Sequence, residues 1–324
     1  MQLLCALVLA AATATPGSSA PQLSAPDAVR VAEFYRLSAQ IQDTLWPGWD
    51  KTPAPLLLIT PKTEYLTHWT QASPDGFVTA GDGLLAHQTT LPLSFSAAMP
   101  LFGPPSVMVV GEPENTQSKT STPWLIAVMH EHFHQLQNAQ PGYYQAVTAL
   151  GLSRGDNTGM WMINYPFPYQ KAKIAHGFAG LRDLLLKTLD AADDGAFKTL
   201  AAQYIGARKE FFAQLAPDDR KYLDFQLWQE GMARYTQVKA AEAAANYQPS
   251  AAFQALPDYE PFGKFASQAR TQTLAELRHI DLATDQRTSV YSFGAAEGFL
   301  LDRLKPNWKN EYFSHLLTTE PLFD

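Results

Sequence analysis

Three residues near the middle of the chain have the spacing of metal ligands on a helix. The segment His-Glu-His-Phe-His places His130, Glu131 and His134 in the pattern H-E-x-x-H. Residues four apart lie on one face of a helix, about a turn apart, so the two imidazoles can reach one cation. Glu131 lies beside them, where a carboxylate can take a proton from a metal-bound water. The pattern predicts a Zn2+ site with Glu131 as general base.

The residues around this pattern predict a helix over 123–138. Thr122 can cap its start, and Pro123 suits its first turn. Apolar residues recur at helical spacing and indicate a buried stripe: Leu125, Met129, Phe133 and Leu136. His132 falls on this stripe, so we expect it to pack or to support a ligand. Because the pattern has only three fixed positions, a chance match that forms a satisfied polar cluster is the alternative.

A third ligand is needed, because a catalytic zinc ion usually has three protein ligands and a water. The best downstream candidate is Glu230, within a predicted helix that Pro217 can start. Gly231 follows it, although a glycine inside a helix costs about 1 kcal/mol relative to alanine. We expect another backbone to approach closely there, as where two ligand-bearing helices meet. The alternative is a solvated Glu230 next to a chance glycine.

The order of these segments resembles a known class of metallopeptidases, the gluzincins. His-Glu-x-x-His is followed by Glu-Gly-x-Ala-x-Tyr at 230–235, and Tyr-x-x-Gly-Ala at 291–295 is similar to a segment of the aminopeptidase-like members. The resemblance is confined to these three short segments. The 95 residues at 135–229 depart from the class, which usually has a shorter connection, and an inserted helical block would account for them.

The resemblance implies a role for each matching residue. Three residues would bind zinc: His130, His134 and Glu230. Glu131 would be the base, and the hydroxyl group of Tyr291 would stabilise the oxyanion of the tetrahedral intermediate.

Other polar side chains are weaker candidates for this site. Three are fallback ligands, although each is more often a surface or packing residue: His176, Glu210 and Asp224. Arg234 lies one turn after Glu230 and would either orient a carboxylate or pair on the surface. We expect Tyr235 to pack and the isolated His279 and His315 to be structural.

Composition limits the class of protein. The chain has 324 residues, enough for one large domain or two lobes around a shared cleft. Its 46% apolar content is typical of a globular protein. The net charge of −7 and the absence of any basic run argue against a nucleic-acid partner.

The N-terminus predicts export. Residues 1–14 are apolar and small residues follow, so residues 1–20 resemble a signal peptide with cleavage after Ala14 or Ala20. The pattern lacks the usual Lys or Arg before the apolar run, and an ordinary apolar N-terminus is the alternative. Cys5 is the only cysteine, so the mature chain would have no disulfide. No later apolar stretch reaches the roughly 18 residues of a membrane span. We expect a secreted or periplasmic protein.

Periodicity predicts an α+β fold of zincin-like type. Alternating runs bounded by Gly and Pro predict strands over 56–60, 65–69, 76–80, 84–90, 91–95 and 106–110. Helical patterns cover 27–41, 172–189, 196–215, 220–245, 265–280, 290–304 and 308–317. A lobe at 21–140 would hold the sheet and the motif helix, and a helical lobe at 141–324 would supply the third ligand. The aromatic connection at 151–168 would either line a cleft or pin the loop to the body.

These observations favour a secreted zinc peptidase that acts on peptide or protein substrates. An extended peptide could pair with an exposed strand edge, either 91–95 or 106–110. Two alternatives stay open: a secreted binding protein with a zincin fold and no catalysis, and a secreted binding protein without a metal. The presence of Glu131 favours the enzyme, because a purely structural zinc site does not need it.

Overall fold

The computed structural model describes residues 21–81 and 83–324. The predicted signal peptide, both predicted cleavage points and Cys5 lie outside these residues. The described chain contains a six-stranded sheet in the order β3-β4-β2-β1-β6-β5, in which β1 and β6 are parallel and the other neighbours antiparallel. The strands are β1 (Leu56–Ile59), β2 (Thr63–Thr67), β3 (Val78–Gly81), β4 (Leu84–Gln88), β5 (Ser96–Met99) and β6 (Val107–Gly111).

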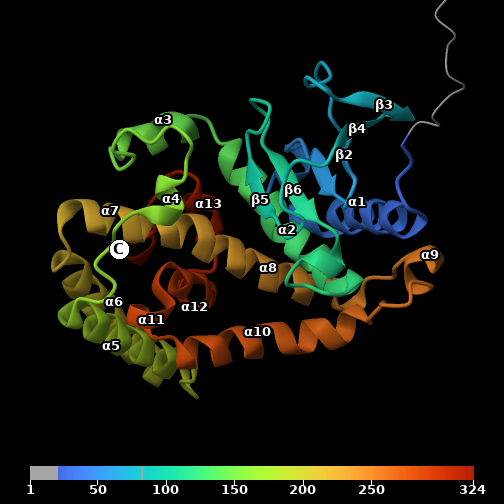
Figure 1. Cartoon of the computed structure of the whole chain (residues 1–324). Helices are drawn as coiled ribbons and strands as arrows, with labels where there is room; N and C mark the ends of the chain where they lie inside the picture. The colour runs from blue at the N-terminus through green and yellow to red at the C-terminus, as the bar shows by residue number, and fades with distance from the viewer. Residues whose placement is uncertain (1–20, 82) are drawn as a thin grey trace, which may run out of the picture.

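Both faces of the sheet are covered at its centre, which is why β1 and β6 are apolar throughout. Alternate residues such as Leu56 and Leu58 join the main hydrophobic core, which includes α1 (Ala25–Leu45) and α2 (Ser121–Asn138). Leu57 and Ile59 point to the other face, into a smaller core. Figure 1 shows α1 and α2 packed beside the sheet.

The predicted strand over 91–95 is wrong. Leu91, Leu93 and Phe95 do alternate, but they pack over the second face of the sheet as a connecting segment. The strand that follows, β5, begins only at Ser96. The predicted strand over 106–110 is confirmed as β6, but it lies between β1 and β5 and is not an edge. The edge strand on this side of the sheet is β5. The other four predicted strands occur within a few residues of their expected positions.

The rest of the described chain is helical, and no strand follows residue 111 in it. The predicted long helices are confirmed, except that 308–317 contains only the short α13. The α-helices after α2 are α3 (Tyr143–Ala149), α4 (Trp161–Asn164), α5 (Ala172–Leu189), α6 (Asp194–Ala213), α7 (Pro217–Gln226), α8 (Met232–Ala243), α9 (Ala251–Gln254), α10 (Phe262–His279), α11 (Leu282–Asp285), α12 (Ser289–Leu304) and α13 (Lys309–Tyr312). Short 3-10 turns lie at η1 (Trp49–Lys51), η2 (Pro113–Asn115), η4 (Ala244–Asn246), η5 (Gln286–Thr288) and η6 (Glu320–Phe323).

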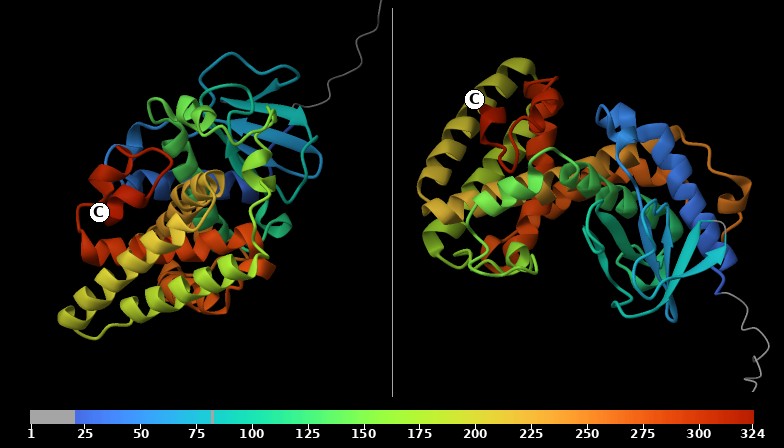
Figure 2. Two further views of the ribbon diagram at one scale, coloured as in Figure 1. Left: turned by 90° about the vertical axis from the view of Figure 1, so that its left-hand side faces the viewer. Right: turned by 90° about the horizontal axis from the view of Figure 1, so that it is seen from above.

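The sheet and the helical part share one hydrophobic core. The buried ring of Trp46, just after α1, contacts Phe133 of α2 and the rings of Trp308 and Tyr312 near the C-terminus. Figures 1 and 2 show the sheet and α1 at one end of the molecule and α5 and α6 at the other, with α2 and α8 between them. The chain is therefore α+β, as predicted; the boundary predicted at residue 140 stays a prediction. In the described residues, no helix is long and apolar enough to cross a membrane.

A π-helical turn, η3 (Leu227–Gly231), joins α7 to α8 and carries Glu230. Gly231 packs against Gly294 of α12: a Cβ added at Gly294 would lie 2.5 Å from the Cα of Gly231. The expected close backbone approach at Gly231 is confirmed, but its partner is α12. The expectation that this glycine marks the meeting of two ligand-bearing helices is wrong, because the other ligand helix is α2.

We predict that Gly294→Ala lowers the free energy of unfolding by about 1–3 kcal/mol, because the new methyl group overlaps backbone that cannot move aside. The matched control is Gly206→Ala in α6, where a Cβ meets nothing within 4 Å. That change should raise stability by roughly 0.5–1 kcal/mol through helix propensity. Urea denaturation of both variants measures the difference. Equal stability changes would contradict the close contact.

Candidate metal centre

The start of α2 is fixed by charged groups outside the helix. The predicted cap at Thr122 is wrong: the helix begins at Ser121, and Thr120 occupies the capping position without a side-chain cap. The Asp258 carboxylate instead accepts hydrogen bonds from the Ser121 backbone N–H (2.8 Å) and from its hydroxyl group. Arg30 of α1 binds both Ser121 (2.9 Å) and Asp258 (3.2 Å). A carboxylate at a helix N-terminus is favourable, so this contact holds α2 in place.

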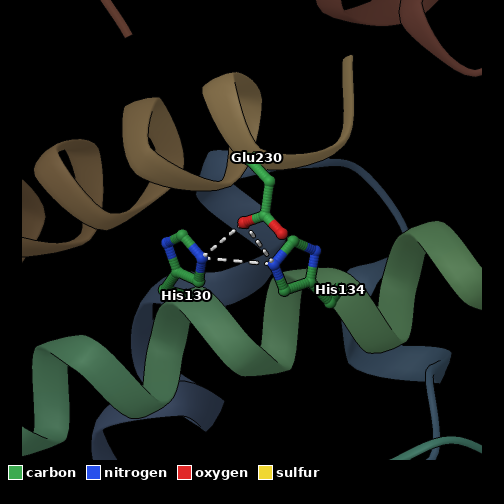
Figure 3. A group of neighbouring side chains, drawn as sticks. All are labelled: His130, His134 and Glu230. Atoms are coloured by element: carbon green, nitrogen blue, oxygen red, sulfur yellow. Dashed lines mark hydrogen bonds and ion pairs between the residues drawn. The ribbon is translucent and has the colours of Figure 1, made fainter. Parts of the chain in front are cut away.

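Two helices bring the three predicted ligands to one point. Figure 3 shows the Glu230 side chain reaching from the π turn onto the rings of His130 and His134, which lie one turn apart on α2. The Oε2 atom of Glu230 lies 3.5 Å from Nε2 of His130 and 3.3 Å from Nε2 of His134. The two Nε2 atoms are 3.1 Å apart. Both histidines are buried and Glu230 is partly buried.

These separations fit a metal ion. Atoms that bind one tetrahedral cation at about 2.0–2.1 Å lie roughly 3.3 Å from one another. The three observed separations of 3.1, 3.3 and 3.5 Å bracket that value. Two imidazole nitrogens and a carboxylate oxygen are also ligand types that a divalent transition metal accepts. The group of His130, His134 and Glu230 could therefore hold a metal ion.

The electrostatics at this point favour a positive charge. Burial alone would lower the pKa of His134, but the charge of Glu230 and its hydrogen bond outweigh burial and raise it to about 9. Burial alone would raise the pKa of Glu230, but the charge of His134 and hydrogen bonds from both imidazoles hold it well below its usual range. The interior is thus arranged to keep Glu230 ionised beside a cation.

Gln137 ties α2 to the π turn. Its Oε1 lies 2.6 Å from Nδ1 of His134 and can accept a hydrogen bond from that nitrogen. When Nδ1 carries the proton, Nε2 of the same ring is free to act as the ligand atom that faces Glu230. The Nε2 of Gln137 donates to the carbonyl groups of Trp228 (2.9 Å) and Gln229 (3.1 Å). The Trp228 carbonyl also accepts from the Tyr312 hydroxyl group at 2.6 Å, and the Gln229 carbonyl from the Met232 backbone N–H, so Gln137 adds a further donor to each. One side chain therefore both orients a ligand and sets the position of Glu230.

The other two histidines of α2 are not equivalent to His134. The Nδ1 of His130 is buried and makes no hydrogen bond to any described residue. His132 points the opposite way, packs against Phe34 and Trp49, and contacts Gln42 through Nε2. Burial lowers the pKa of His132 to about 4, so it is neutral. The expectation that His132 packs in the interior is confirmed.

Glu131 lies next to the centre and contacts the edge of the sheet. It is buried, and its Oε1 accepts a hydrogen bond from the hydroxyl group of Ser96 at 2.8 Å. Ser96 is the first residue of β5, the edge strand. The carboxylate therefore has a fixed position between the metal ligands and a strand with an open edge.

Tyr291 and Arg287 complete the centre on the α12 side. The Tyr291 ring is stacked near the His130 ring, with centroids 6.1 Å apart. Its hydroxyl oxygen accepts a hydrogen bond from Nη2 of Arg287 at 3.1 Å. Nη1 of Arg287 lies 3.5 Å from Oε1 of Glu230. Burial and the Glu230 charge raise the pKa of Tyr291, so its phenol stays protonated at neutral pH and can donate a hydrogen bond.

The weaker candidates lie outside the centre. Arg234 pairs with Glu276 (2.9 Å), which confirms the surface alternative, and Tyr235 packs in the core. Asp224 is buried but is bound by Thr319 and faces Arg208. Four further residues do not belong to the group that could hold a metal ion in the described chain: His176, Glu210, His279 and His315.

Sequence reasoning missed three residues of the centre. Gln137 lies three residues after His134, a spacing that places two side chains on the same helix face, so this signal was present. Ser96 and Arg287 had no comparable local signal, because each reaches the centre through the tertiary fold. Arg234, the arginine that the sequence suggested, pairs with Glu276 instead of a carboxylate of the centre.

Comparisons with known proteins add no relative. No protein-family model, no curated protein sequence and no solved structure matches this chain. The interpretation of the centre therefore rests on its own geometry and on the three short segments named above.

We predict that Gln137→Leu weakens zinc binding by about 10- to 100-fold, because His134 loses its orienting partner and the π turn loses two donors. Competition with a chromogenic chelator measures the affinity. Gln140→Leu, two residues after the end of the same helix and half-buried, is the control and should bind zinc like the wild type. Unchanged affinity in Gln137→Leu would show that the centre does not depend on this contact.

Proposed function

We propose that this chain is a zinc-dependent peptidase of the gluzincin type, with a zincin-like arrangement of sheet, motif helix and helical lobe. The observation that carries the proposal is the convergence of Glu230, from a distant helical segment, onto His130 and His134. The donor set of two histidines and one glutamate is that of catalytic zinc sites. An ion held by three protein ligands keeps a position for water, as hydrolysis requires.

Zinc bound here would lower the pKa of a bound water and polarise a carbonyl group. Side chains of this protein would move the protons and stabilise the developing charge. Glu131, fixed by Ser96, would accept the proton of the attacking water and pass it to the leaving amine. Tyr291, protonated at neutral pH, would donate a hydrogen bond to the developing oxyanion.

The substrate would be an extended peptide. A peptide strand can pair with an open sheet edge through main-chain hydrogen bonds. Of the two edges, β5 is the one that begins at Ser96 beside Glu131, so pairing there would place a peptide bond near the base. The predicted signal peptide supports a location of this activity outside the cytoplasm, secreted or periplasmic.

We predict that the purified wild-type protein, reconstituted with zinc, holds about one equivalent. His134→Ala and Glu230→Ala should each reduce the bound zinc to a small fraction at the same free concentration, because each removes a ligand. Elemental analysis after gel filtration measures the content, and His279→Ala, an exposed histidine, is the control. Wild type that retains no zinc would overturn the metal assignment.

We predict that Glu131→Gln keeps the zinc but lowers peptide hydrolysis by about 10²- to 10⁴-fold, because an amide cannot accept the proton of the water. Cleavage of a mixture of peptides of varied sequence, followed by mass spectrometry, measures the activity. Glu210→Gln, an exposed glutamate of α6, is the control. Zinc-loaded wild type that cleaves nothing in the mixture would favour the alternative, a binding protein without catalysis.

A further inference from the structure

A cavity of about 530 Å³ opens beside the candidate metal centre. One wall is the segment 163–171, and the opposite wall is formed by Gln286 and Arg287. Arg287 joins the cavity to the centre, since its guanidinium group lies 3.5 Å from Glu230 and 3.1 Å from the Tyr291 hydroxyl group. Arg287 is therefore the residue that the cavity lining shares with the surroundings of the centre.

The charges around the cavity are of one sign. Lys171 and Arg287 line it, and its lining contains no Asp or Glu. The whole chain is acidic, with 31 acidic and 24 basic residues, so the charge of the cavity lining is opposite to the net charge of the protein. The cavity therefore offers two positive charges, of which that of Arg287 also faces Glu230 at 3.5 Å.

The wall at 163–171 is held in place, as a binding surface requires. The ring of Tyr165 stacks on Tyr222 of α7 with centroids 4.4 Å apart, and Phe167 is buried. Gln226 of α7 donates to the Met162 carbonyl group at 2.9 Å and accepts a hydrogen bond from Arg287 at 3.3 Å. Gln226 thus links this wall to the arginine. The aromatic connection both pins the loop and lines a cavity, so both alternatives from the sequence occur.

Arg287 has capacity for a further acceptor. Its three contacts, to Gln226 (3.3 Å), Glu230 (3.5 Å) and Tyr291 (3.1 Å), are all longer than the 2.7–2.9 Å typical of charge-assisted hydrogen bonds. Its Nε makes no hydrogen bond to any described residue. A guanidinium group has five N–H donors in a planar fork that matches a carboxylate.

The backbone before Arg287 is strained. Gln286 has φ 49° and ψ −128°, a conformation that side chains other than glycine rarely adopt. Such a conformation costs about 1–3 kcal/mol and persists where the surrounding structure requires it, often at functional sites. Here it turns the chain between α11 and α12 at the residue that precedes the arginine.

We propose that this cavity is the subsite that binds a carboxylate group of the substrate, with Arg287 as the specificity-determining residue and Lys171 at the rim. The inference rests on the proposed function for the location of the scissile bond. The ligand class is a peptide with a free carboxylate close to the cleaved bond, either its own C-terminus or an acidic side chain. A carboxylate there would pair with Arg287 while the neighbouring carbonyl group reaches the centre.

The test uses the zinc-loaded full chain with Glu131→Gln, so that binding is measured without cleavage. The first probe pair is N-acetyl-tetra-alanine with a free C-terminus and the same peptide amidated. The second pair has Glu or Gln as the last residue of an amidated peptide. Isothermal titration should give about 10- to 100-fold tighter binding for the carboxylate member of one pair, which identifies the source of the carboxylate.

Adding Arg287→Gln should remove this ratio, because the neutral amide cannot pair with a carboxylate as the guanidinium group does. Lys171→Gln, a change to an exposed side chain, should reduce the ratio in part. Arg278→Gln, an exposed arginine of α10, is the charge-matched control and should keep the ratio. Zinc content is measured for every variant, so loss of the ion is not mistaken for loss of the subsite.

Two results would overturn the subsite. The first is equal affinity for the charged and the neutral peptides. The second is an Arg287→Gln variant that lowers the affinity for both peptides equally, because Arg287 would then be only a positioning residue. Failure of the proposed function is a different result. A protein that hydrolyses no peptide but still shows the Arg287-dependent ratio would keep the subsite and lose the peptidase.

Discussion

The centre depends on how Gln137 attaches one helix to another. Its amide group donates to two carbonyl groups of the π turn and to the Tyr312 hydroxyl group at 2.8 Å, while its oxygen faces His134. These carbonyl groups also accept from the Met232 backbone N–H and the Tyr312 hydroxyl group, and Gln137 adds the contact that joins them to α2. The same side chain of α2 orients His134. The positions of His134 and Glu230 are thus set by the same contact.

The hydrogen-bond partners of Glu230 differ from those of the other buried carboxylates. Glu297 is buried and receives hydrogen bonds from Tyr204 (2.6 Å) and Arg208 (2.6 Å). Asp224 receives two from Thr319. Those groups have protein donors and need nothing more. Glu230 instead faces two imidazole nitrogens that also face each other. When both nitrogens have lost their protons, three atoms with lone pairs surround one point. A cation satisfies all three at once.

The sequence predicted well what depends on local spacing. The helix over α2 and the pair His130 and His134 followed from a period of four residues. Glu230 followed from the motif around it, although 95 residues separate it from His134. The prediction of a strand over 91–95 was wrong because alternation of apolar residues shows only which side chains are buried. A segment that lies over the face of a sheet buries alternate side chains in the same way as a strand. The predicted cap at Thr122 was wrong because the carboxylate of Asp258, far along the chain, accepts the hydrogen bond from the backbone N–H at the start of α2.

The residues that could not be predicted share a cause. Arg287 reaches Glu230 because α12 packs against the π turn through Gly231 and Gly294, and the strained backbone at Gln286 turns the chain before it. No periodicity reports such a contact. Gly231 did carry a signal, but a glycine says only that some backbone approaches closely, and the direction of approach is a tertiary property.

The long connection between His134 and Glu230 also builds a wall of the cavity beside the centre. That connection contains α3 to α7 and the segment 163–171, whose aromatic rings stack on α7 and form a fixed wall. The α7 helix leads directly into the π turn, and its residue Gln226 contacts both the wall and Arg287. This connection is therefore not a separate appendage. It holds the third ligand on one side and shapes the adjoining space on the other, so a change in its length would alter the centre and the cavity together.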